Sequence, residues 1–145
     1  MSALPLTLAS RRIAGLMLLT VVGIEFGGWF MTRIVRGAVP MTEFQQDFAR
    51  AGHAHAGVLV TLGLACLLLA DAGGLRGPLG WVARLGVPIA AALMSAGFFL
   101  SSLGTEGTEP NDLIILLWLG AASLAAGVLS LGLGLLFDRS GPPSV

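Results

Sequence analysis

The chain has 145 residues, the length of one domain, with 55% hydrophobic and 11% charged residues and a formal net charge of zero. Its apolar residues form long blocks that lack the polar stripe of a soluble amphipathic helix, so we expect lipid to surround most of the chain. All of its basic residues are arginines near the ends of these blocks, and no basic patch exists that would bind nucleic acid.

The first predicted helix covers residues 13–35, which is long enough to cross a hydrocarbon core of about 30 Å. Arg11 and Arg12 precede this block, so a signal peptide is an alternative interpretation. The block is too long for one, Glu25 interrupts it, and no small-x-small cleavage site follows. We therefore expect a membrane-spanning helix.

The second predicted helix covers residues 42–70 and starts before its apolar block. Thr42 and Gln45 have the spacing of a capping box, in which both side chains satisfy free amide groups of the first turn. The helix should therefore begin outside the membrane and enter it further along.

The remaining chain contains two more apolar blocks. Residues 71–80 are rich in glycine and predict a turn, after which Arg84 suits the interface and a third helix covers residues 86–104. Pro88 then falls in its first turn. A fourth helix covers residues 111–137. The sequence thus predicts one all-α domain over residues 1–145, an integral membrane four-helix bundle.

The distribution of arginines predicts the orientation in the membrane. Five arginines flank the N-terminus, the second loop and the C-terminus: Arg11, Arg12, Arg76, Arg84 and Arg139. Three flank the first and third loops: Arg33, Arg36 and Arg50. The positive-inside rule then places both termini in the cytoplasm of a multi-pass protein, in a bacterial cytoplasmic membrane.

Every predicted helix carries two small residues spaced four apart, the pattern that lets membrane helices approach closely. The pairs are Gly23 and Gly27, Gly52 and Ala56, Ala92 and Ala96, and Ser123 and Gly127. We interpret them as packing positions within the bundle or in a homo-oligomer.

Glu25 is the most informative single residue because it lies near the centre of a membrane span. A charged carboxylate there costs about 2.5–3.5 kcal/mol, so we expect Glu25 to have either an interaction partner or a functional role. A carboxyl group hydrogen-bonded to a neighbouring helix and a catalytic or proton-carrying group are both compatible with this position.

His53 and His55 are the only histidines. A step of two residues rotates about 200° around a helix, so the two imidazoles should point to nearly opposite faces and cannot both bind one ion. One should face the first helix, and the other a second helix, a cofactor or a neighbouring protomer. Histidines two apart on a membrane helix resemble those of haem-copper oxidases, which makes haem or a transition metal possible cofactors of His53 and His55.

We expect a shared polar pocket in the outer half of the bundle. Glu25 would form its floor and His53 or His55 its wall, with Glu25 and His55 as the candidate catalytic acid and base. The other candidate lining residues are Trp29, Thr32, Arg33, Arg36 and Arg50.

Two stretches carry a resemblance to known proteins. Glu25 to Gly28 reads Glu-Phe-Gly-Gly, and Phe48 to Gly57 contains Ala-Gly-His-Ala-His-Ala-Gly. Both resemble segments of small bacterial integral membrane proteins with four helices, which implies architecture only. The layout is more distantly similar to hydroxylaminobenzene mutase, whose histidine is followed by Leu-Glu-Gly where this chain has Ala56-Gly57.

Three functions follow from these patterns. The first is a haem- or metal-binding redox module, or a proton-handling module, built on the Glu/His pocket. The second, implied by the mutase resemblance, is a cofactor-free membrane isomerase that acts on a small apolar or aromatic ligand. The third is a non-catalytic subunit of a homo-oligomer or larger membrane complex.

Overall fold

The computed structural model describes residues 6–137, so Arg139 and the rest of the predicted tail lie outside the described residues. This part of the chain contains four α-helices and a short 3-10 helix, and the prediction of an all-α fold is confirmed. The helices are α1 (Leu8–Val35), α2 (Glu43–Ala72), α3 (Gly77–Ser101), η1 (Asp112–Ile114) and α4 (Ile115–Phe137). All four spans, η1 and α4 forming one of them, are long and apolar enough to cross a membrane.

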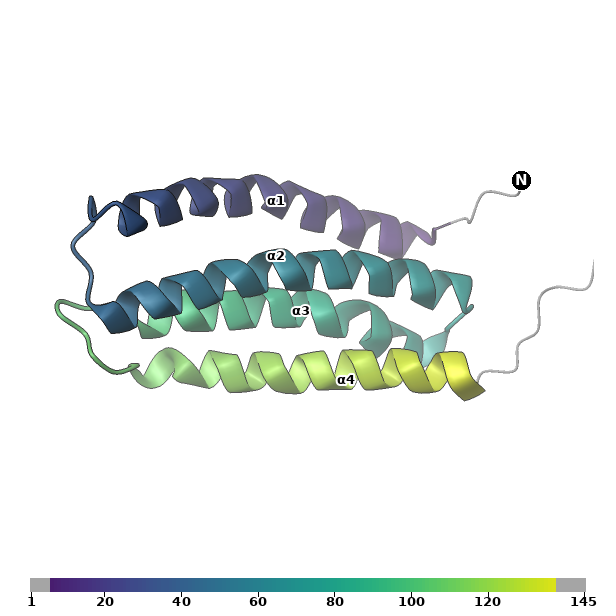
Figure 1. Ribbon diagram of the computed structural model, residues 1–145. Coiled ribbons are helices and arrows are strands. Elements are labelled where there is room, and N and C mark those ends of the chain that lie inside the picture. Colours follow the sequence, from purple (N-terminus) through teal and green to yellow (C-terminus); the bar gives the residue numbers. More distant parts are fainter. Residues whose placement is uncertain (1–5, 138–145) are drawn as a thin grey trace, which may run out of the picture.

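The helices run antiparallel in chain order (Figure 1). The start of α1, the α2–α3 turn and the end of α4 lie at one end of the bundle, which we call the terminal end. The other two loops lie at the opposite end, which we call the loop end. The most extensive interface joins α3 to α4, followed by that between α2 and α3. In contrast, α1 packs mainly on α2, barely meets α3 and does not touch α4.

The start of α2 is as predicted. Thr42 is its N-cap, the Gln45 amide N–H donates to the Thr42 hydroxyl at 3.2 Å, and the Thr42 amide N–H donates to the Gln45 side chain at 3.1 Å. The Gln45 side-chain amide also donates to the carbonyl oxygens of Ser102 and Gly104, at 3.0 and 2.8 Å. One buried side chain therefore caps α2 and fastens it to the end of α3.

The predicted boundaries of the third helix, of the turn before it and of the first helix differ from those in the structure. The third helix starts at Gly77 rather than at residue 86 and ends at Ser101, so Pro88 lies inside α3, and Pro78 occupies its first turn instead. The predicted turn over residues 71–80 shrinks to residues 73–76. Likewise α1 begins at Leu8 and includes Arg11 and Arg12. An apolar block marks the part of a helix that contacts lipid, whereas the helix itself continues into the polar interface.

Glycines allow α3 and α4 to approach closely. A side-chain carbon added at Gly86 would lie 2.5 Å from the Cα of Gly127, and the Ser123 hydroxyl donates to the Gly86 carbonyl at 2.8 Å. The predicted small pair Ser123 and Gly127 therefore does pack, against Gly86 of α3. Gly52 of α2 similarly lies against the rings of α3 aromatic residues.

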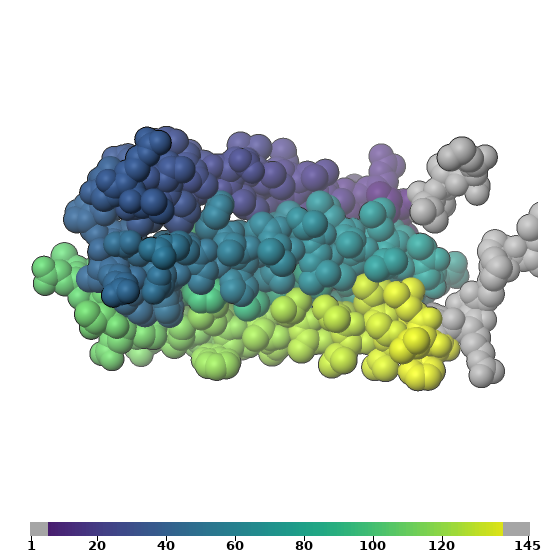
Figure 2. Space-filling model, viewed as in Figure 1, coloured from purple at the N-terminus to yellow at the C-terminus, as the bar shows by residue number. Residues whose placement is uncertain are grey.

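The helix α1 forms a separate ridge along one side of the molecule, with a furrow between it and α2 (Figure 2). Very little of its apolar window is buried within the chain. Its outer surface carries large exposed apolar side chains, among them Leu19, Val22 and Phe26. This surface is therefore available to lipid or to another helix.

Candidate functional site

His53 lies on the face of α2 that packs against α1. Carbons added at Gly27 and Gly28 would lie 3.2 Å from its Nδ1 and 3.6 Å from its Nε2, respectively. A carbon at Gly27 would crowd the imidazole, whereas one at Gly28 would make an ordinary van der Waals contact with it. Neither ring nitrogen has a hydrogen-bond partner within residues 6–137. His53 thus occupies the α1–α2 interface with both nitrogens available.

His55 faces the opposite side, toward α3. Its Nδ1 lies 2.8 Å from the Ala51 carbonyl oxygen of its own helix, and its ring stacks on Phe98 with 4.8 Å between centroids. The two imidazoles diverge as the 200° rotation requires. Within the described part of the chain, no group of three or more histidine, cysteine or acidic side chains is placed to hold a metal ion. The geometry of these histidines therefore does not fit a shared metal site.

Glu25 is exposed on the flank of α1, one helical turn from Gly28 and hence from the His53 ring. A cavity lies between α1, α2 and α3, and Ile24 and Ala56 are among its lining residues. Glu25, His53 and His55 are not among its lining residues. Glu25 and His53 thus lie on the neighbouring helices α1 and α2, whereas His55 faces α3. The predicted pocket of Glu25 with His53 or His55 stays a prediction.

The other predicted lining residues lie at or near the loop end. The Thr32 hydroxyl donates to the Trp29 carbonyl at 2.7 Å, and the guanidinium of Arg33 lies 5.3 Å from the centre of the Trp29 ring. Arg50 pairs with Asp47 of its own helix at 3.3 Å. Arg36, which follows α1 as its C-cap, is exposed. Arg33 and Arg50 therefore interact with neighbours on their own helices.

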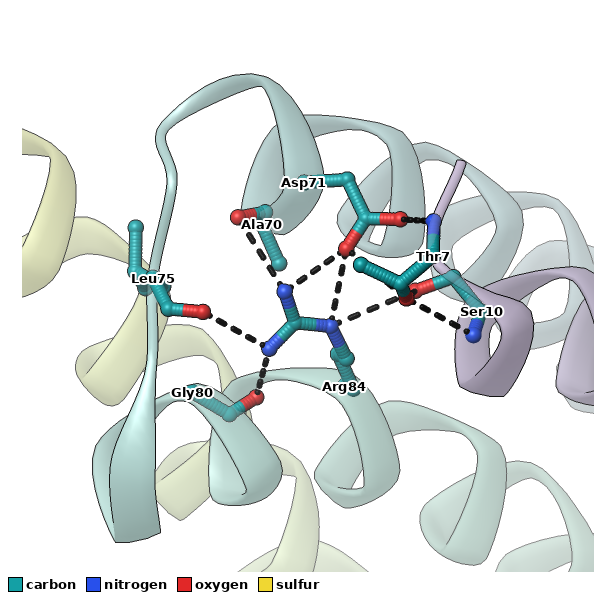
Figure 3. A network of polar contacts seen from close by, with 7 residues as sticks. All are labelled: Thr7, Ser10, Ala70, Asp71, Leu75, Gly80 and Arg84. Atoms are coloured by element: carbon teal, nitrogen blue, oxygen red, sulfur yellow. Dashed lines mark hydrogen bonds and ion pairs between the residues drawn. The ribbon is translucent and has the colours of Figure 1, made fainter. Parts of the chain in front are cut away.

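Sequence reasoning missed an ion pair at the terminal end (Figure 3). Arg84 was expected at the membrane interface, but its side chain is only 9% exposed and it binds Asp71, itself 4% exposed, with 2.6 Å between Nη2 and Oδ1. The guanidinium also donates to carbonyl oxygens of Leu75 and Gly80, at 3.0 and 2.9 Å. The pair closes the α2–α3 turn from inside.

The same pair also attaches α1. The Thr7 amide N–H donates to Asp71 at 2.7 Å, and Arg84 Nε donates to the Ser10 hydroxyl at 3.2 Å. Three helices therefore meet at one satisfied charge pair. Opposite charges on either side of a glycine-rich turn were the available sequence signal, since such a turn brings the two helix ends together.

No family model matches this chain, and no curated protein or solved structure matches it.

Proposed function

We propose that this protein is a multi-pass membrane module that handles protons through Glu25 and His53. The observation that carries the proposal is the position of the His53 imidazole against Gly27 and Gly28, one turn of α1 from Glu25. His55 instead faces α3, where its ring lies on Phe98.

The spacing of Glu25 and Gly28 on α1 supports proton exchange with His53. Side chains three residues apart on a helix have Cβ atoms about 5–6 Å apart, and His53 Nε2 lies 3.6 Å from where a Gly28 Cβ would be. A glutamate side chain is long enough to span such a turn, so a rotation of the Glu25 side chain would bring its carboxyl group toward His53, directly or through one water. Transfer of a proton between the carboxyl group and the imidazole leaves the net charge of the pair unchanged, which limits the cost of charge in hydrocarbon.

Infrared spectroscopy of the protein in liposomes tests this pair. Between acidic and alkaline pH, the wild type should show a Glu25 carboxylic acid band that disappears as the acid ionises, in addition to the bands of the seven other acids. The Glu25 band is the one that Glu25→Gln removes, and His53→Gln should shift the pH at which it disappears. His55→Gln is the matched control and should leave it unchanged. Identical carboxylic acid bands in the wild type and in Glu25→Gln, or a Glu25 band that His53→Gln leaves unchanged, would overturn the proposal.

The orientation belongs to the same proposal. We place both termini in the cytoplasm of a bacterial inner membrane, with Glu25 and His53 in the outer half of the bundle, because more arginines flank the terminal end. A C-terminal green fluorescent protein fusion should fluoresce, whereas a C-terminal alkaline phosphatase fusion should be inactive. Active phosphatase would reverse the orientation.

The exposure of Glu25 favours a second candidate, a non-catalytic subunit of an oligomer. Acidic residues in membrane spans almost always face a protein interior or water, yet Glu25 is exposed on α1, the helix with the least covered surface. If its role is assembly alone, Glu25→Gln should lower the molar mass measured by light scattering in detergent. His53→Gln should then leave both that mass and the infrared titration unchanged.

A further inference from the structure

A cavity of about 410 Å³ lies between α1, α2 and α3. Ile13, Met17 and Ile24 line it from α1, and Val60 and Pro88 line it from α2 and α3. Its volume falls in the range of about 300–1,000 Å³ that is typical of small-molecule sites. No ionisable side chain lines it. An occupant should therefore be neutral and largely apolar.

The cavity is reached from the bilayer. Its lining residues lie within three of the candidate membrane spans, and α1 barely meets α3, so the wall between these helices is incomplete. Protein interiors are packed to the density of organic crystals, and an open space of this size is uncommon in one. A molecule dissolved in the lipid can enter it sideways without crossing water.

Ser95 of α3 gives this cavity one unused polar group. It lines the cavity, and its hydroxyl oxygen is buried with no hydrogen-bond partner within residues 6–137. Thr20 lines the same cavity, and its hydroxyl donates to the Met17 carbonyl at 2.6 Å. Such a bond to a carbonyl of the same helix is the usual partner of a helical serine or threonine hydroxyl, and Thr20 uses it. A buried hydroxyl without a partner costs about 1–3 kcal/mol. Rotation about its χ1 angle would turn the Ser95 hydroxyl toward an occupant.

We propose that this cavity binds a neutral, lipid-soluble alcohol, phenol or ketone, with its apolar body among the aliphatic side chains and its oxygen hydrogen-bonded to Ser95. The proposal is independent of the Glu25–His53 pair, because neither residue lines the cavity. A negative result for proton handling would therefore leave this proposal unaffected, and the reverse also holds.

Two matched probes test it: 4-hexylphenol and hexylbenzene, which differ by one hydroxyl. Binding to the full chain in lipid nanodiscs is measured by equilibrium dialysis against empty nanodiscs. The wild type should bind the phenol more tightly than the hydrocarbon. Ser95→Ala should weaken phenol binding about fivefold, the effect of one hydrogen bond of about 1 kcal/mol, and leave hexylbenzene binding unchanged.

A second pair of variants locates the site. Ala92→Phe narrows the cavity and should weaken the binding of both probes at least tenfold. Ala122→Phe, on an exposed α4 position that does not line the cavity, should change neither. Thermal melting checks that each variant is folded, and without a probe Ser95→Ala should be as stable as the wild type or more so.

Two results would overturn the proposal. Equal binding of both probes to the wild type and to Ser95→Ala would show that the cavity takes any hydrocarbon chain, such as a lipid tail. Binding that survives Ala92→Phe in a folded protein would put the probes elsewhere.

Discussion

Replacement of Arg84 by methionine tests how much the charge pair at the terminal end contributes to the fold. Methionine keeps the apolar stem and removes a guanidinium that donates to Ser10, Asp71 and three backbone carbonyl oxygens. The Asp71 carboxylate, almost fully buried, keeps only its hydrogen bonds from Thr7. Removing one partner of a buried ion pair lowers the free energy of unfolding far more than replacing both partners by neutral residues does.

The expected loss in the free energy of unfolding is about 3 kcal/mol for Arg84→Met, the lower end of the range for a broken buried pair, because the pair lies near the end of the bundle. Asp71→Asn should lose about 2 kcal/mol, since the amide still accepts from Thr7 but leaves the guanidinium without a counter-charge. The double variant removes both charges together and should lose about 3 kcal/mol rather than the sum of about 5.

Reversible unfolding in mixed micelles with increasing SDS, followed by tryptophan fluorescence, measures these differences. Arg76→Met is the matched control, because Arg76 is an exposed arginine at the same end, and it should change stability by less than about 0.5 kcal/mol. The reasoning fails if Arg84→Met costs no more than this control, or if the two single losses simply add.

The same unfolding assay tests two further positions. Gly127→Leu should lose at least about 2 kcal/mol because an added carbon would lie 2.9 Å from the Cα of Gly86. Gly132→Leu on the same helix, where nothing lies within 4 Å, should change little, and equal losses would contradict the close approach. Gln45→Ala should lose about 1–3 kcal/mol and speed hydrogen exchange in residues 102–104, since its amide serves two carbonyl groups there. Gln46→Ala is its control, and a similar acceleration in that variant would show that Gln45 does not hold this segment.

The sequence predicted what depends on local rules. Four apolar blocks gave four spans, the Thr42 capping box fixed the start of α2 to the residue, and the 100° step of a helix predicted that His53 and His55 diverge. Each of these features depends only on residues that are close together in the sequence. The start of α3 was misplaced because Gly77 and Pro78 were interpreted as part of the turn, whereas the helix begins there.

What the sequence left open depends on partners far apart in the chain. The glycine-rich turn between Asp71 and Arg84 was a sequence signal for their pairing, but nothing in the sequence indicates that Ser10 of α1 also binds the guanidinium. The glycines beside Glu25 were interpreted as packing positions, and only the structure identifies His53 as what packs there. The hydroxyl of Ser95 is likewise an ordinary helical serine until its lack of a partner is seen.

The unequal helix contacts have a consequence for biosynthesis. The interface between α3 and α4 is the most extensive among the described helices, yet α4 leaves the ribosome after the other three. The first hairpin therefore enters the bilayer with little to hold it and must wait there for its partners. A nascent chain stalled before α4 would expose Gly86 and its neighbours to lipid and to membrane proteases. Quality control should accordingly recognise the loss of α4 far more readily than a displacement of α1.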